Sequence, residues 1–395
     1  MKTCIQEPTT AAQVSQKIPY SRQCIGQEEI AAVTAVLQSD FLTQGPAVAA
    51  FEKELSEYLG AQAVSCSNGT TALHLACAAL DIDENSIGVV TPISFAASAN
   101  CLRYVGAEVV FSDIDSASGH LCPKALEKTL KKLKPKSDNN VVVAVSLNGQ
   151  VADLQSIQAV SKKYGFKVIE DAAHSFGGHS ETFKSADCTY SDIATLSFHP
   201  LKSITTGEGG SVVTRFPEIA KRIRCLRGHG IVTNVDGKPA WYKDQVALGW
   251  NFRLCDIQAA VGSAQLKKLD NFVAARQKIA QRYRQTLSQK PFSDIFSLNP
   301  DTPGHAYHLF VLRFSQAGRR DCAYNFLKRN NIESQVHYPL ISQLSDYKKQ
   351  HGRKSLPNAE QYAESCLSIP IFPQMTQEQQ DRVIEALLTF RKMCE

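Results

Sequence analysis

Short apolar segments alternate with helical ones through the first half of this chain, and this alternation limits the fold more than any other feature. The helical stretches that we expect are Thr70–Leu80, Phe95–Tyr104, Pro123–Leu133 and Leu154–Tyr164. The expected strands are Ala63–Cys66, Ile87–Thr91, Glu108–Ser112, Val141–Ser146, Lys167–Asp171, Ile193–Phe198 and Gly210–Thr214. This alternation is typical of βαβ units in a mostly parallel, buried sheet. The sequence therefore predicts an α/β fold whose ligands bind at the carboxyl ends of the strands.

The pattern changes near Asp256, which suggests a second unit. A long helix is expected over Asp256–Gln289, and a mixed set of elements follows it. These are a strand at Tyr307–Phe314, a helix at Asp321–Asn330, a segment at Glu333–Tyr338 and a final helix at Gln377–Lys392. Before the sheet, helices are expected at Glu28–Gln38 and Val48–Leu59. We predict a flexible leader (1–18), a large domain (19–255), and a linking helix with a small α+β C-terminal domain (256–395).

Composition argues against several classes of protein. The net charge of +5 is spread along the chain, so no nucleic-acid partner is expected. No apolar run reaches membrane-spanning length and the first residues lack a signal-peptide core, so no membrane association is expected. The 12 cysteines include no Cys-x-x-Cys pair, which predicts reduced thiols and no metal site. These features predict a cytoplasmic enzyme.

Two residues suggest a particular chemistry when they are taken together. Lys202 lies between Ser197 and the glycine-rich turn Gly207-Glu-Gly-Gly210, and Asp171 ends an apolar strand. A lysine that forms a Schiff base, with an acid that protonates a pyridine ring, is what pyridoxal phosphate chemistry requires. Alone, Lys202 would be a surface lysine and Asp171 would cap a turn. The combination predicts a pyridoxal phosphate enzyme.

Further residues suggest how that cofactor would be held. The segment Asn68-Gly69-Thr70 opens a helix directly after a strand, so its N–H groups could bind a phosphate, although an ordinary helix cap has the same pattern. Ser197 would add a hydroxyl to that phosphate site. Phe95 could stack on the ring or be a plain core residue. His174 could contact the phenolic oxygen, although a lone histidine is more often structural.

Five blocks of the sequence resemble the DegT/StrS-type sugar-nucleotide aminotransferases from about Ile18 onward. They are Leu42-Thr-Gln-Gly-Pro46, Ser67-Asn-Gly-Thr-Thr-Ala-Leu73, Glu170-Asp-Ala-Ala-His174, Ser197-Phe-His-Pro-Leu-Lys202 and Gly249-Trp-Asn-Phe-Arg-Leu-Cys-Asp-Ile-Gln258. Four segments look most like the pseudaminic acid branch: Thr91-Pro-Ile-Ser-Phe95, residues 197–206, Asn251-Phe-Arg-Leu254 and Gln335-Val-His-Tyr338. The resemblance implies a pyridoxal-phosphate-dependent transferase of fold type I.

The resemblance also implies a role for each residue of the site. Lys202 would form the Schiff base, Asp171 would pair with the ring nitrogen and His174 would lie by the phenolic oxygen. Asn251 would reach the phosphate site of a partner subunit, which implies a homodimer with shared active sites. The remaining cofactor contacts would be Asn68, Gly69, Thr70, Phe95 and Ser197, and the sugar-nucleotide contacts would be Tyr20, His229, Arg253 and His337.

The activity that this resemblance implies is transfer of an amino group from L-glutamate to C4 of a UDP-linked 4-keto-6-deoxy-N-acetylhexosamine. The product would be UDP-4-amino-4,6-dideoxy-N-acetyl-β-L-altrosamine, an intermediate of pseudaminic acid biosynthesis. Three alternatives stay open. The acceptor could be another UDP-, dTDP- or GDP-linked keto sugar. The protein could be a pyridoxal-phosphate-dependent sugar dehydratase, although histidine replaces the Schiff-base lysine in those enzymes. It could also be a regulator that keeps the fold as a sensor, although such a protein would be expected to lose the cofactor residues, and all of them are present here.

Overall fold

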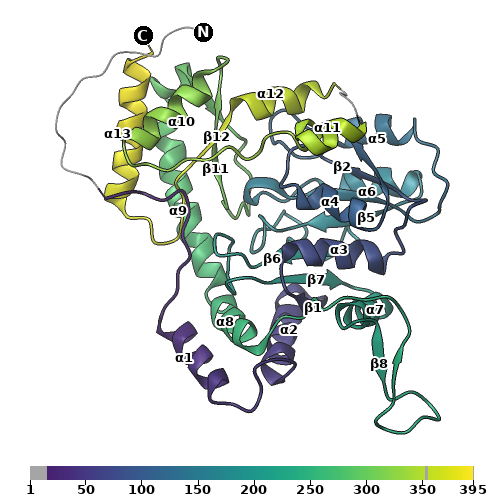
Figure 1. The fold of residues 1–395 in the computed structure, drawn as a ribbon. Coiled ribbons are helices and arrows are strands. Elements are labelled where there is room, and N and C mark those ends of the chain that lie inside the picture. The colour runs from purple at the N-terminus through teal and green to yellow at the C-terminus, as the bar shows by residue number, and fades with distance from the viewer. Residues whose placement is uncertain (1–15, 352–354, 395) are drawn as a thin grey trace.

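The computed structural model describes residues 16–351 and 355–394, and a seven-stranded sheet forms its centre (Figure 1). The order across the sheet is β1-β7-β6-β5-β4-β2-β3, and all neighbours are parallel except at β7, which runs antiparallel to both β1 and β6. The strands are β1 (Gln62–Cys66), β2 (Ile87–Val90), β3 (Glu108–Phe111), β4 (Asn140–Val145), β5 (Phe166–Asp171), β6 (Ile193–Ser197) and β7 (Gly210–Thr214). The α/β class and all seven predicted strands are therefore confirmed.

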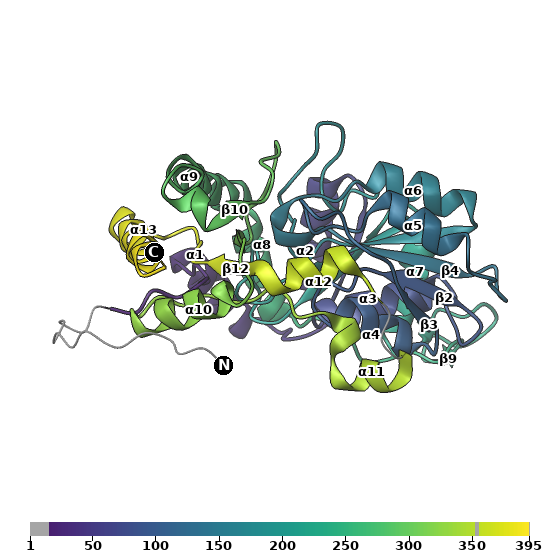
Figure 2. The same cartoon turned by 90° about the horizontal axis from the view of Figure 1, so that it is seen from above.

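Helices cover both faces of this sheet, which explains why its strands are apolar without interruption. Val141, Val143 and Val145 of β4 pack toward α3 and α4, whereas Val142 and Ala144 pack toward α5 and α6. Figure 2 shows the two pairs of helices on opposite sides of the strands. The helices of this part are α1 (Gln27–Leu37), α2 (Pro46–Leu59), α3 (Gly69–Ala79), α4 (Ala97–Tyr104), α5 (Pro123–Leu130), α6 (Leu154–Lys163) and α7 (Pro217–Arg227), with a 3₁₀ turn η1 (Leu147–Gly149) after β4.

The C-terminal part builds a second core around a three-stranded antiparallel sheet, β10-β11-β12. Its strands are β10 (Phe296–Leu298), β11 (Phe310–Phe314) and β12 (Cys366–Ile369). Its helices are α8 (Asp256–Leu266), α9 (Leu269–Leu287), α10 (Arg319–Arg329), α11 (Ser345–His351), α12 (Pro357–Ser365) and α13 (Gln377–Lys392), with short turns η2 (Phe292–Asp294) and η3 (Ile341–Gln343). A hairpin of β8 (Ile231–Thr233) and β9 (Lys243–Gln245) projects near α7 (Figure 1).

The division of the chain into domains stays a prediction. Three residues contact a different part of the chain from the one to which the prediction assigns them. Residues 1–15 of the expected leader lie outside the described part, while Ile18 is buried and bridges to Ile332 of the C-terminal part. Tyr347 of α11 and Tyr362 of α12 pack into the core beside the large sheet. No helix of the described residues is long and apolar enough to cross a membrane.

Two elements differ from the prediction in ways that matter for the site. The expected helix over Asp256–Gln289 is two helices, because the chain turns at Lys268, whose amine pairs with Glu29 of α1 at 2.7 Å. The expected strand at Tyr307–Phe314 begins only at Phe310. Tyr307 adopts a left-handed backbone conformation (φ 47°) instead, and the segment before β11 bonds to the turn after β4.

Candidate active site

A cavity of about 540 Å³ lies at the carboxyl ends of the central strands, where a parallel sheet is expected to bind its ligand. β4, β5 and β6 each end at its wall, at Val145, Asp171 and Ser197. Ten residues that the sequence suggested for the site line this cavity: Tyr20, Asn68, Gly69, Thr70, Phe95, Asp171, His174, Ser197, Lys202 and His337. Segments more than 300 residues apart thus meet in one place.

Lys202 lies in the turn that follows β6. Its backbone N–H donates a hydrogen bond to the carbonyl of His199 at 2.9 Å. The backbone N–H of Thr206 donates to the carbonyl of Phe198 at 3.0 Å and closes the turn. Burial lowers the pKa of Lys202 from 10.5 to about 8, although the nearby Asp171 carboxylate opposes this shift. A lysine with such a pKa has a substantial uncharged fraction near neutral pH, which a nucleophilic amine requires.

Asp171 is fixed by contacts on two sides. The hydroxyl of Ser98 donates to Oδ2 at 2.6 Å, and the backbone N–H of Ala173 donates to Oδ1 at 3.1 Å. Ser98 is itself 2.7 Å from Ser94, so the start of α4 positions the carboxylate. Asp171 is 6% exposed. A buried carboxylate with a fixed orientation at a strand end is well placed to accept a hydrogen bond from a cationic ring nitrogen.

His174 lies in a group of aromatic residues. Its Nε2 is 3.1 Å from the hydroxyl of Tyr338, and its ring is 4.3 Å from the ring of His308 between centroids. Burial, together with the charge of Lys202, holds the pKa of His174 well below 6.5, so the imidazole is neutral. Nδ1 of His174 is buried, and no residue in the described ranges bonds to it.

The turn between β1 and α3 offers a cradle for an anion. Asn68 caps α3, because its side chain accepts from the N–H of Thr71 at 2.9 Å. The first N–H groups of an α-helix have no acceptor within it, and the first two residues of α3, Gly69 and Thr70, line the cavity together with Ser197. A Cβ on Gly69 would come within 2.8 Å of the Cβ of Ser197, so only glycine lets the backbone approach this closely. The Asn68 side chain serves the cap, which leaves the backbone to hold a phosphate.

Three of the sequence-suggested residues are not among those that line the cavity. Asn251 and His229 are exposed and Arg253 is half-buried. They belong to segments that pair with each other, since His229 donates its N–H to Trp250 at 2.9 Å and Gly228 bridges to Asn251. Their roles at the sugar-nucleotide and partner-subunit sites remain predictions.

Sequence reasoning did not identify Ser98, His308 or Tyr338 as site residues. Ser98 follows Ser94 by one helical turn, and that spacing at the start of a helix was the available signal. His308 was placed in a strand, and Tyr338 appeared only inside the Gln335–Tyr338 match. Both reach the cavity through tertiary folding of the C-terminal part.

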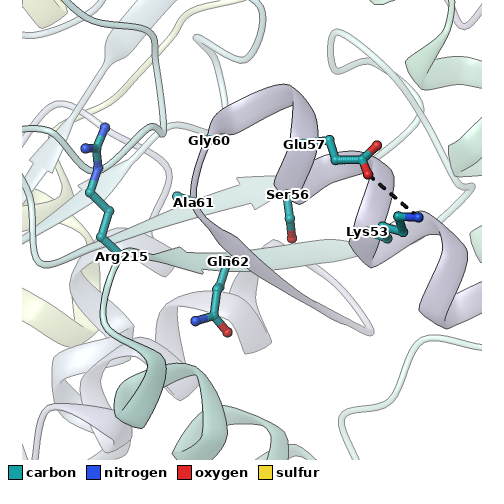
Figure 3. Close-up of a pocket in the computed structure, with 7 residues that line it drawn as sticks. All are labelled: Lys53, Ser56, Glu57, Gly60, Ala61, Gln62 and Arg215. Carbon is teal, nitrogen blue, oxygen red and sulfur yellow. Dashed lines mark ion pairs between the residues drawn. The ribbon is translucent and has the colours of Figure 1, made fainter.

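A second hollow, of about 510 Å³, lies at the end of α2 beside β1 (Figure 3). It is lined by Lys53, Ser56, Glu57, Gly60, Ala61, Gln62 and Arg215. Lys53 and Glu57 are exposed and pair across one helical turn at 3.8 Å, which is a weak surface interaction. None of the sequence motifs reaches this hollow, so the chemistry belongs to the first cavity.

The residues of the first cavity fit pyridoxal phosphate. The amine of Lys202 suits an aldehyde, and the carboxylate of Asp171 suits a protonated ring nitrogen. The close approach of the backbone at Gly69 to Ser197 suits a phosphate. The unpartnered Nδ1 of His174 matches a polar substituent on the ring. Among the described residues no group of His, Cys, Asp and Glu is arranged to hold a metal ion.

Comparisons with known proteins agree with this geometry. The profile of the DegT/DnrJ/EryC1/StrS aminotransferase family matches residues 23–388. The chain is similar in structure to Helicobacter pylori PseC, an aminotransferase involved in the biosynthesis of pseudaminic acid, with a TM-score of 0.88, 28% identity, and coverage of 95% of this chain and 100% of that one. TlmJ, an aminotransferase from Streptoalloteichus hindustanus, gives a TM-score of 0.87 at 28% identity, covering 96% and 100%.

A third similar structure contains a cofactor. NtdA from Bacillus subtilis, solved with the bound cofactor PMP, gives a TM-score of 0.82 at 26% identity and covers 93% of this chain and 82% of that one. The predicted enzyme class, fold and cofactor are confirmed: the protein is an aminotransferase and its cofactor is pyridoxal phosphate. The chain belongs to the DegT/DnrJ/EryC1/StrS aminotransferase family.

Proposed function

We propose that this aminotransferase transfers an amino group from L-glutamate to C4 of a UDP-linked 4-keto-6-deoxy-N-acetylhexosamine, as in pseudaminic acid biosynthesis, and that it works in the cytoplasm. The observation that carries the proposal is Lys202 beside Asp171 at the wall of one cavity. The choice of sugar is supported by the four segments that resemble the pseudaminic acid branch and by the similarity to PseC.

The residues of the cavity divide the work between them. Pyridoxal phosphate, when bound, supplies a carbonyl that accepts the amino group and a ring that withdraws electrons. The Nζ of Lys202 would be the nucleophile that holds the cofactor, and as a free amine it would take and return the proton at the reacting substrate carbon. Asp171 keeps the ring nitrogen protonated. The N–H groups at the start of α3 hold the phosphate, so the position of the ring is fixed relative to Lys202.

The lining of the cavity supports a shared active site in a homodimer. Among the described residues that line it, Lys202 is the only lysine, and no arginine lines it. Two carboxylates of a glutamate or the diphosphate of a nucleotide sugar need further cations. Large apolar side chains are also exposed on segments near Asn251, including Trp241 (78%) and Leu248 (80%). Exposed apolar surface of this kind is typical of an interface.

Subunit mixing tests the shared site. By resemblance Asn251 bonds to the partner's phosphate, and a hydrogen bond to a charged acceptor contributes roughly 1.5–3 kcal/mol, so Asn251→Ala should weaken cofactor retention about tenfold to a hundredfold. At a cofactor concentration that fills the wild type but not Asn251→Ala, Lys202→Ala and Asn251→Ala subunits should each show little activity alone and should regain it when they are exchanged, because one site then has both residues. A fully active monomer, or no recovery in verified heterodimers, would contradict the proposal.

A substrate panel tests the choice of sugar. The purified protein should be incubated with L-glutamate and the products of 4,6-dehydratases that act on UDP-, dTDP- and GDP-sugars, with Lys202→Ala as the inactive control. Nitrogen should be found at C4 of the UDP-linked product by NMR. Preference for a dTDP- or GDP-sugar, or nitrogen at another carbon, would support the aminotransferase alternatives. Loss of water from the sugar without amino transfer would indicate the dehydratase.

A further inference from the structure

The imidazole of His174 has a hydrogen-bond partner on one side only. Nε2 is 3.1 Å from the hydroxyl of Tyr338, while Nδ1 is buried and has no partner among residues 16–351 and 355–394. His174 as a whole is 6% exposed. A buried ring nitrogen without a partner is costly unless a ligand completes it. Which of the two ring nitrogens carries the proton therefore decides whether Nδ1 can donate a hydrogen bond to a ligand atom or accept one from it.

The environment keeps both partners of this hydrogen bond uncharged. Burial, together with the charges of Lys202 and His337, holds the pKa of His174 well below 6.5. Burial also raises the pKa of Tyr338 above 10, and Tyr20 and Asp171 add to that shift. A neutral imidazole carries one proton, on either Nδ1 or Nε2, and a neutral phenol has one proton to donate.

Counting the unsatisfied groups selects one of these two forms. If the proton is on Nδ1, Tyr338 donates to Nε2, and only the Nδ1–H group lacks a partner among the described residues. If it is on Nε2, that N–H donates to Tyr338, and both the phenolic proton and the lone pair of Nδ1 lack partners among the described residues. His174 is the only residue in the described part of the chain to which the Tyr338 hydroxyl bonds. The first arrangement leaves one group unsatisfied and the second leaves two, so the first is more stable.

Two neighbouring rings fix the orientation of the His174 imidazole. Tyr338 stacks on His174 at 30° with centroids 6.0 Å apart, and His308 lies 4.3 Å away. His308 is positioned by the segment that precedes β11, since the N–H groups of Ala306 and Leu309 donate to the turn after β4 at 2.8 and 3.0 Å. The ring cannot turn over without displacing this packing.

We propose that Tyr338 is a positioning residue that acts through His174, holding it in the Nδ1-protonated form so that Nδ1–H can donate to an acceptor oxygen of the bound cofactor. Without the phenol the two tautomers share the population. The apparent affinity for the cofactor then falls in proportion to the competent fraction. This inference depends on the cofactor and not on which sugar the enzyme uses.

The tautomer can be measured without any turnover. Cofactor-free protein labelled with ¹⁵N-histidine has ten histidines, and the His174 signals are assigned by their loss in His174→Gln. In the wild type the proton should be on Nδ1, and in Tyr338→Phe a mixture of tautomers should be seen. A proton on Nε2 in the wild type would refute the proposal whatever the variant does.

A binding experiment separates positioning from general damage. Tyr338→Phe should raise the dissociation constant for pyridoxal phosphate about threefold to tenfold, the loss expected for one neutral hydrogen bond. Tyr58→Phe is the matched control: it also removes one hydroxyl and one hydrogen bond, to Asp270 at 2.8 Å, but at a residue that does not line the cavity, and should leave binding unchanged. Adding Tyr338→Phe to His174→Gln should cause no further loss, because the phenol acts through the imidazole. Additive losses would overturn the proposal.

Discussion

Burial of Glu170 predicts how the free energy of unfolding of this protein depends on pH. It precedes Asp171 on β5, so its side chain points to the opposite face of the sheet from the cavity. There it is 1% exposed and accepts hydrogen bonds from Ser146 and from the N–H of Ala186, both at 3.0 Å. Burial raises the pKa of Glu170 from 4.5 to about 7, and the charges of Asp187 and Asp171 add to the shift. The folded protein therefore holds a proton here that the unfolded chain releases.

The sign of the pH dependence follows from this proton. Between pH 4.5 and 7 the folded state binds more protons than the unfolded state, so the free energy of unfolding decreases as pH rises through that window. For pKa values of 4.5 unfolded and about 7 folded, the contribution of Glu170 should fall by about 2.5 kcal/mol between pH 5 and pH 8. Glu170→Gln keeps the shape of the side chain and has no proton to lose.

Denaturation by urea at pH 5, 6, 7 and 8 would test this reasoning. The difference in unfolding free energy between Glu170→Gln and the wild type should shift in favour of the variant by about 2.5 kcal/mol over that range. Taking the difference cancels the titration of all other groups. Exposed Glu385→Gln is the control for loss of one carboxylate and should show no such trend. A difference that does not change with pH would show that Glu170 titrates normally and that burial does not control its charge.

Three further predictions concern the proposed catalytic residues Lys202 and Asp171. Lys202→Ala should lose the yellow colour of the bound cofactor and nearly all turnover, and undiminished transaminase activity would contradict its role. In the wild type, the rate at which cofactor-free protein captures pyridoxal phosphate should rise with pH through about 8, since only the uncharged amine reacts; a rise only near the usual lysine value of 10.5 would contradict the effect of burial. Asp171→Asn should still fold but slow proton transfer at the substrate carbon by about two orders of magnitude or more, and full rate restored by excess cofactor would argue against an electronic role.

The central sheet was predictable from sequence because its strands are buried on both faces. A strand such as β4, with valines pointing to both layers of helices, is a continuous apolar run that polar turns interrupt at each end. Lys202 and Asp171 were also predictable, because Asp171 is the last residue of such a strand and Lys202 lies in the turn that follows the next one, so that local sequence places both. The positions of these two residues needed no knowledge of distant contacts.

The aromatic group around His174 could not be predicted in the same way. His308 reaches the cavity because Tyr307 adopts a left-handed conformation and the segment bonds to the turn after β4, and neither feature has a local signal. The break between α8 and α9 likewise depends on Lys268 pairing with Glu29, which is 239 residues away. Such features are set by contacts between distant segments, which periodicity in one segment does not report.

The lack of an ion pair between Lys202 and Asp171 in the described part of the chain would explain how both could serve the proposed reaction. A lysine paired directly with a carboxylate would stay charged and could not act as a nucleophile. In the described part of the chain no ion pair involves Lys202, and Asp171 is instead turned toward Ser98 and the N–H of Ala173. Burial therefore outweighs the attraction between the two residues, and the pKa of Lys202 falls to about 8. In the proposed function, Ser98 would thus keep the carboxylate available for the ring nitrogen and leave the amine of Lys202 free to react.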